Sequence, residues 1–420
     1  MKSGAMRRGL WLAVTALVGA AAMSAQPRVL NGIDVLERSH FSALKELAAR
    51  HGGHLRVAIM TNQTGLDIEG RRTVDILAKD AAQQVPGLSV VKLFSPEHGI
   101  NGTLDQSDVS DDRDKATGLH VISLYGETDA QRRPSKAQLA DLDAVVIDLQ
   151  DVGVHYYTYE TVVGYFVEAA SGTDVEVIVL DRPNPINGIA VEGPISTPGR
   201  ESYTNYSSEP VRHGMTLGEL ATYFKAKSHL QTHLTVVRMD GWKRSDWFDE
   251  TGLSWINPSP NMRSLRAAIL YPGIGLLEST NLSVGRGTDT PFEWIGAPWL
   301  DGEKLATYLS ARKIPGIHFI PTRFTPGSNY PFHGEECGGV QFYVTDRNLL
   351  NSPELGLEIA AALYKLYPNT FQIDRVDDLA LNRSVVDALK AGKDPREVMA
   401  ADEREMEEFK RARAGALLYR

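Results

Sequence analysis

Short apolar runs separated by polar loops organise the chain from residue 54 onward. The runs "LRVAIM" (55–60), "LSVVKLF" (88–94), "HVISLY" (120–125), "DAVVIDL" (143–149) and "VEVIVL" (175–180) are nearly continuous in apolar, often β-branched residues. Between them, residues 73–84, 135–141 and 158–170 repeat apolar positions every three to four residues, which is helical spacing. Strands that are apolar on both faces and alternate with helices predict a parallel β-sheet covered on both sides.

A sixth run, "HLTVVRM" (233–239), follows a helix expected at 217–228 and extends this sheet. The loops that leave the first five strands are "TNQTG", "SPEHGING", "GETD", "QDVGVHYYTY" and "DRPNPINGIAVEGP". In open α/β sheets, ligands bind beyond the carboxyl ends of the strands. We therefore expect these loops to converge on one edge of the sheet and to form the site there.

The pattern changes after Trp255, where the Pro- and Asn-rich segment "INPSPNM" begins. Beyond it, the spacing predicts helices near 265–270 and 302–312, strands in 316–324 and 338–346, and helices from residue 353. This predicts an α/β domain at 28–256 followed by a smaller α+β domain at 257–420. The last residues, 402–420, are expected to form a charged amphipathic helix that packs as a cover.

The N-terminus, residues 1–25, has a basic start, an apolar run from Leu10 to Ala22 and small residues after it, which is typical of a secretory signal peptide. A membrane anchor is the alternative, but the apolar run is short for a bilayer. We expect an exported protein, periplasmic or secreted, with no stable membrane insertion after cleavage. Its one cysteine, Cys337, is expected to be buried, so that the fold depends on its core.

Charge and motifs exclude several function classes. The net charge of -9 and the absence of basic clusters argue against nucleic acid as a partner. The chain has no G-x-S-x-G, phosphate-loop or H-E-x-x-H motif, and no Gly-rich first turn for NAD. The acidic segment 105–118 lacks calcium-loop spacing and is expected to be solvated, and "HGEEC" (333–337) is too isolated for zinc. We therefore expect no metal and no cofactor.

Carboxylates at the predicted strand ends remain as candidate chemistry: Glu97, Asp148, Asp151, Asp181 and Glu192. Glycosidic cleavage needs an acid that protonates the leaving oxygen, commonly with a second carboxylate. Glu97 fits the acid best, because Pro96 restrains its loop while Gly99 and Gly102 allow sharp turns. Asp148 and Asp181 are equally well explained as loop caps that accept backbone N–H bonds.

The same loops carry amides and aromatics suited to sugar hydroxyls, acetamido groups and ring faces: Asn62, Gln63, Gln150, Tyr156, Tyr157, Tyr159, Asn184, Asn187, Asn261, Asn281, Trp294 and Trp299. Arg182, Arg212, His213 and Arg286 add positive charge to an acidic protein. Each arginine alone suits a structural ion pair, but together they favour a small anionic ligand, because arginine binds carboxylates through paired hydrogen bonds.

Ordered motifs from about His54 to the C-terminus resemble the NamZ-type exo-β-N-acetylmuramidases, glycoside hydrolase family 171, long described as a domain of unknown function. The matching segments are "TNQTG", "FSPEHGI", "SLYG", "DLQDVG", "DRPNPING", "RHGMTLGELA", "PSPNM", "YPGIGLLESTNLSVGRGT" and "PFEWIGAPW". The resemblance implies a Rossmann-like domain joined to a smaller one, with the active site in the cleft between them. It also implies removal of terminal N-acetylmuramic acid from the non-reducing end of peptidoglycan fragments, in cell-wall turnover or recycling.

In this family the glutamate of the E-H-G motif is the proposed catalytic residue, which here is Glu97, with His98 beside it to tune it or to hold the loop. Asp148 or Asp151 is then expected as a second carboxylate, or as the group that holds the substrate's acetamido group. The lactyl carboxylate of muramic acid would give the arginines a partner. We expect the saccharide to be bound by Asn62, Gln150, His155, Tyr157, Arg182, Asn184, His213, Asn281 and Arg286.

One position departs from the family pattern. Relatives usually carry arginine where this chain has His155, so contact with the substrate carboxylate there would require a protonated imidazole and would depend on pH. Two other functions stay open: a muropeptide-binding protein without turnover, and a periplasmic esterase or amidase. The latter needs an activated Ser or Cys nucleophile, which no motif supplies.

Overall fold

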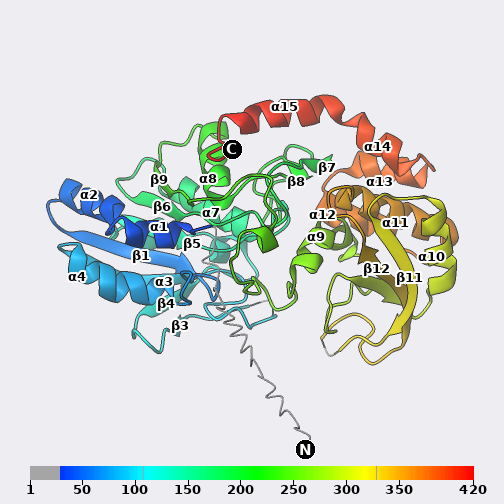
Figure 1. Cartoon of the computed structure of the whole chain (residues 1–420), viewed down its shortest axis with the longest axis horizontal. Coiled ribbons are helices and arrows are strands. Elements are labelled where there is room, and N and C mark those ends of the chain that lie inside the picture. Colours follow the sequence, from blue (N-terminus) through cyan, green and yellow to red (C-terminus); the bar gives the residue numbers. More distant parts are fainter. Residues whose placement is uncertain (1–28, 107, 328) are drawn as a thin grey trace, which may run out of the picture.

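The computed structural model describes residues 29–106, 108–327 and 329–420, so the predicted signal peptide at 1–25 lies outside the described residues. Two domains lie side by side, and the C-terminal helix runs above both (Figure 1). In the part of the chain that is described, no helix is long and apolar enough to cross a membrane.

The first domain is built on a seven-stranded sheet with the order β3-β4-β2-β1-β5-β6-β9. The strands are β1 (Leu55–Thr61), β2 (Leu88–Ser95), β3 (Asp112–Arg113), β4 (His120–Ser123), β5 (Ala144–Asp148), β6 (Glu176–Leu180) and β9 (His233–Val237). All pairings are parallel except that of β3 with β4. The six predicted strands and the Rossmann-like fold are thereby confirmed, and the strand order reverses between β1 and β5.

Helices cover both faces of this sheet, which explains why its strands are apolar throughout (Figure 1). One face packs against the N-terminal helices and residues 73–84, and the other against α7 and α8. The helices of this domain are α1 (Gly32–Arg38), α2 (Ser42–Arg50), α3 (Thr73–Asp75), the π-helical turn η1 (Ile76–Ala81), α4 (Ala82–Gln84), α5 (Asp129–Arg132), α6 (Lys136–Leu139), α7 (Tyr159–Ala169) and α8 (Leu217–Lys227). The helix expected at 135–141 is a single turn.

A hairpin of β7 (Glu192–Ile195) and β8 (Pro210–Arg212) and the short helix η2 (Phe248–Glu250) complete this domain. The hairpin also packs against α11 (Ser352–Leu366) of the second domain. The apolar cluster on this side runs without a break into the second domain, which fixes the two domains as one packed body.

The second domain has a three-stranded antiparallel sheet in the order β10-β12-β11. Its elements are α9 (Leu265–Ile274), η3 (Gly275–Leu277), β10 (Trp294–Ala297), α10 (Gly302–Ala311), β11 (Ile317–Phe324), β12 (Cys337–Val344), α11 (Ser352–Leu366), η4 (Ile373–Val376), α12 (Asp377–Ala380), α13 (Arg383–Lys390) and α14 (Pro395–Ala401). The predicted α+β domain is confirmed, and Cys337 is fully buried. Helix α9 packs closely on α11 because Gly273 faces the Ser352 carbonyl where a Cβ would clash.

The chain ends by returning to the first domain. Helix α15 (Glu403–Ala414) leads there, and Arg413 Nη1 donates to the His213 carbonyl oxygen at 3.0 Å. Tyr419 then donates its hydroxyl to Asp181 at 2.6 Å, at the end of β6. The predicted covering helix is therefore the first part of a C-terminal strap (403–420) that links both domains.

Candidate functional site

A pocket of about 220 Å³ lies between the two domains. The first domain contributes Glu97, His98, Tyr156, Tyr157, Thr158, Tyr159 and Thr204, and the second contributes Ser259, Met262, Tyr271, Glu278, Ser279, Arg286, Phe292 and Leu379. It therefore occupies the place expected from the family resemblance, and it brings together six of the residues singled out from the sequence: Glu97, His98, Tyr156, Tyr157, Tyr159 and Arg286.

Glu97 reaches the pocket because β2 ends in a sharp turn. Strand β2 stops at Ser95, and both His98 and Gly99 adopt left-handed backbone conformations, with φ of 70° and 73°. Thr158, at the start of α7, donates its hydroxyl to Glu97 Oε2 at 2.8 Å. Burial raises the pKa of the Tyr125 hydroxyl, and the neighbouring Glu97 carboxylate raises that pKa further. Two elements of the first domain thus fix the position of this carboxylate.

His98 holds the loop in which it lies. Its Nδ1 is 2.6 Å from the Leu104 carbonyl oxygen, so the ring donates a hydrogen bond from Nδ1. This bond joins the two ends of the loop formed by residues 98–104. The same loop reaches the second domain, where Asn261 donates its amide to Asp105 Oδ2 at 2.9 Å. Tyr330 also donates its hydroxyl to Asp105. Part of the acidic segment that was expected to be solvated therefore bridges the two domains.

Aromatic side chains form one wall of the pocket that Glu97 lines. Tyr157 packs edge-on against Tyr159 with 4.9 Å between the ring centroids, and Tyr271 packs in the same way against Phe292 at 4.7 Å. The Tyr159 hydroxyl donates to the Pro258 carbonyl oxygen at 2.7 Å and accepts from Asn62 Nδ2 at 2.8 Å. Asn62 therefore orients this wall from behind and is not one of the lining residues.

Glu278 is a pocket residue that the sequence interpretation missed. It follows η3 in the second domain, and its Oε1 forms a close ion pair with Arg286 Nη2. Burial raises the pKa of Glu278, Arg286 lowers it, and the negative charge of Glu97 raises it again. The motif "GLLESTNLSVGRGT" contained the signal, since it places Glu278 eight positions before Arg286.

Asp148 and Asp181 hold the strand ends together. Asp148 is fully buried and pairs with Arg182, whose Nη2 lies 2.9 Å from Asp148 Oδ2. Asp181 accepts hydrogen bonds from Thr216, Gly218 and the C-terminal strap.

Asp151 does not line the pocket either. Its Oδ2 accepts the Gly153 N–H at 2.7 Å, and burial raises its pKa to about 7.

His155 lies behind the pocket wall, fully buried, with Nε2 3.0 Å from the Leu379 carbonyl oxygen. Burial lowers its pKa to about 4, so the imidazole is neutral near pH 7. His213 is buried in the same region, and burial lowers its pKa to about 3. Neither imidazole is placed to meet an anionic substrate in this pocket.

The remaining predicted ligands lie elsewhere. Gln150 and Arg182 line a separate cavity of about 350 Å³ beyond the ends of β1, β5 and β6. Asn184 donates to the Met215 carbonyl oxygen at 2.9 Å, and Asn281 donates to the Thr370 carbonyl oxygen at 2.9 Å. Strand-end position thus predicted the edge of the sheet at which this pocket lies, but it did not predict which side chains line the pocket.

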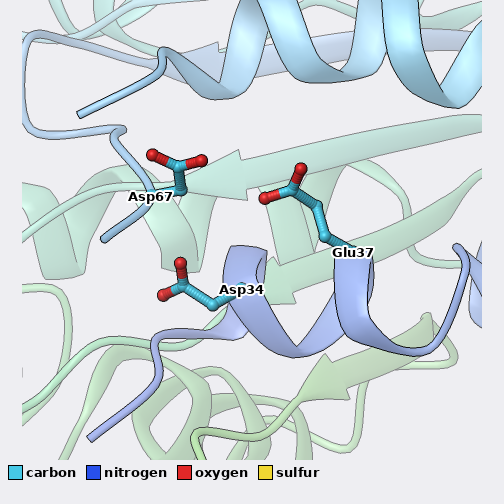
Figure 2. Close-up of side chains that lie close together, drawn as sticks. All are labelled: Asp34, Glu37 and Asp67. Carbon is cyan, nitrogen blue, oxygen red and sulfur yellow. The ribbon is translucent and has the colours of Figure 1, made fainter. Parts of the chain in front are cut away.

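A group of carboxylates near α1 resembles a cation site. The side chains of Asp34, Glu37 and Asp67 lie close together in Figure 2. Arg71 Nη2 lies 2.6 Å from both Glu37 Oε1 and Asp67 Oδ2. Asp34 accepts the backbone N–H groups of Ile68 and Asn31, each at 2.8 Å. Since arginine and backbone donors already meet these oxygens, the geometry is that of a structural ion cluster.

Comparisons with known proteins agree with this architecture. The family model described as exo-beta-N-acetylmuramidase NamZ, N-terminal, matches residues 57–266, and its C-terminal counterpart matches residues 269–419. The chain is 36% identical over 398 residues to a peptidoglycan beta-N-acetylmuramidase NamZ of Bacillus subtilis (strain 168), covering 94% of this chain and 92% of that protein.

Two solved structures of DUF1343 family proteins from Bacteroides fragilis NCTC 9343 share the fold. The first has a TM-score of 0.82 and 32% identity, over 94% of this chain and 99% of the other. The second has a TM-score of 0.72 and 29% identity, over 93% of this chain and 99% of the other. With both domains matched in order, the chain belongs to the NamZ exo-β-N-acetylmuramidase family and is a glycoside hydrolase.

Proposed function

We propose that this enzyme removes terminal N-acetylmuramic acid from the non-reducing end of peptidoglycan fragments, with Glu97 as the general acid. The observation that carries the proposal is the position of Glu97 in the interdomain pocket, fixed by Thr158 and by the turn after β2. The proposal is further supported by the Bacillus subtilis relative, whose name gives both the substrate polymer and the sugar.

The pocket suits one terminal sugar. Its volume of about 220 Å³ is below the ~300 Å³ at which typical small-ligand pockets begin, so it takes a single residue better than a continuous glycan. Tyr157 and Tyr271 offer apolar ring surface to a sugar face. Arg286 is the one lysine or arginine among the described lining residues, and it is the candidate partner for the lactyl carboxylate.

In the proposed reaction, protonated Glu97 donates to the glycosidic oxygen as the bond to the anomeric carbon breaks. The hydrogen bond from Thr158 keeps the carboxyl group in one orientation. An esterase or amidase with a cysteine nucleophile loses support, because Cys337 is buried in β12 and is not a lining residue of this pocket.

A substrate pair with different leaving groups tests the role of Glu97. Glu97→Gln is expected to lower kcat on the disaccharide MurNAc-GlcNAc by about 100-fold or more, since general acid catalysis contributes roughly 10²–10⁴. The loss on an activated nitrophenyl β-N-acetylmuramide is expected to be smaller, because nitrophenolate leaves without a proton. Exposed Glu46 on α2 supplies the matched control, Glu46→Gln. Equal rates for Glu97→Gln and wild type would end the role assigned to Glu97.

We further propose that the protein acts outside the cytoplasm in cell-wall turnover. The signal-peptide pattern at residues 1–25 supports export. Cell fractionation and N-terminal sequencing of the mature chain are expected to find it exported and cleaved near Ser24 or Ala25; a retained, uncleaved chain would contradict this.

A further inference from the structure

Two carboxylates from different domains face the same pocket. Among the described lining residues, Glu97 of the first domain and Glu278 of the second are the acidic ones. Their charges interact, because the charge of Glu97 raises the pKa of Glu278. Asp148 and Asp151, either of which was expected as the second carboxylate, do not line this pocket. A glycosidase commonly uses a second carboxylate besides its acid, and the pocket contains one.

The environment of Glu278 differs from that of Glu97. Glu97 accepts a neutral hydroxyl, whereas Glu278 is in a close ion pair with Arg286. An arginine guanidinium stays positively charged, and the pair favours the ionised form of its partner. The Glu278 backbone N–H donates to the Gly275 carbonyl oxygen at 2.9 Å, so the 3₁₀ turn fixes this end of the pair. Burial is the larger effect and raises the pKa of Glu278, while the Arg286 guanidinium opposes that shift and holds the carboxylate in place.

We propose that Glu278 is the second catalytic carboxylate, which faces the anomeric carbon as Glu97 faces the leaving oxygen; this inference rests on the proposed function. When the glycosidic bond breaks, its electron pair stays on the leaving oxygen, which takes the proton of Glu97. Glu278 stabilises the positive charge left at the anomeric carbon. Water then adds to that carbon and returns one proton to Glu97, so each cleavage consumes one water.

Leaving-group dependence separates this role from that of Glu97. Glu278→Gln is expected to lower kcat by about 100-fold or more on both MurNAc-GlcNAc and the nitrophenyl muramide, because charge at the anomeric carbon develops whatever group leaves. The control is Glu303→Gln, an exposed glutamate on α10 of the same domain. Urea unfolding and circular dichroism establish that each variant is folded.

Azide provides a readout that a purely structural ion pair would not move. With Glu278→Ala, sodium azide is expected to restore nitrophenol release and to yield a glycosyl azide, because a small anion can enter the space of the missing carboxylate and attack the anomeric carbon. A folded Glu278→Gln within threefold of the wild-type rate on both substrates would overturn the inference. So would a slow Glu278→Ala that azide leaves unchanged.

A shorter carboxylate covers the case in which loss of the charge prevents folding. Glu278→Asp keeps the negative charge but moves the carboxylate away from the substrate by the length of one methylene group. We expect it to lower kcat at least tenfold with little change in KM. An unchanged kcat would overturn the inference. The failure of the proposed function is distinguishable, because then wild-type enzyme would cleave neither muramide.

Discussion

Arg182 shows how a residue chosen for substrate binding can serve the fold instead. Its guanidinium is 7% exposed and pairs with Asp148, which is 0% exposed, at the carboxyl ends of β5 and β6. The sequence shows that both residues follow apolar strands, but it does not show that they face each other across the sheet. Only the register of β5 on β6 decides that they form a buried pair.

Removing one partner of this pair tests its structural role. Arg182→Met is expected to lower the free energy of unfolding by about 3–5 kcal/mol, because Asp148 is left as an uncompensated buried charge. Arg375→Met is the control: it removes an exposed pair with Asp378 and is expected to cost about 1 kcal/mol or less. Urea unfolding measures both. Equal, small effects would show that the buried pair contributes no more than a surface one.

Asp151 makes stability depend on pH. Folding raises its pKa to about 7, while the unfolded chain releases the proton near pH ~3.9. The folded state holds the proton more tightly, so the favourable contribution is complete below about pH 4 and is lost as pH rises through about 7.

Asp151→Asn is therefore expected to stabilise the protein at pH 8, by about 4 kcal/mol, and to change its stability little at pH 4. The Gly153 N–H keeps an acceptor, and kcat on the muramide is expected to stay near the wild-type value because Asp151 is not a pocket residue. Unfolding curves across this pH range test the first point. A parallel pH dependence in both proteins would contradict it.

At the scale of elements, the pattern of apolar positions predicted the sheet well. Strands such as β5 and β6 are buried on both faces, so burial alone requires the continuous apolar runs that the sequence shows. Helix α6 is shorter than its spacing suggested, and a π-helical turn interrupts residues 73–84. Local patterns do not encode such details, because tertiary packing decides where a backbone turn ends.

At the scale of the whole molecule, the pocket depends on contacts that no local pattern contains. Glu97 and Glu278 are 181 positions apart in the sequence and meet only because the second domain packs on the first. The strand-end rule located Glu97 but had no means of locating Glu278, which follows a short 3₁₀ turn outside the sheet.

The C-terminal strap is expected to stabilise the first domain directly. Tyr419→Phe removes the hydroxyl that donates to buried Asp181, and its cost is expected to be about 1–3 kcal/mol, because a buried acceptor loses a donor. Tyr343→Phe, which removes a hydroxyl from a side chain that is 54% exposed, is the control and is expected to stay within about 0.5 kcal/mol. Thermal and urea unfolding measure the stability of both variants. Equal effects would show that the strap does not stabilise the first domain.

This strap also orders events during synthesis. Tyr419 bonds to a residue 238 positions earlier, and Leu418 donates to Glu219, 199 positions earlier. A ribosome makes these donors after the whole first domain, so that domain lacks them until residues 418 and 419 have been made, although domains generally fold from the N-terminus as they emerge. Such non-local closure slows folding. Late closure would thus keep the chain unfolded for longer, which fits the export proposed above.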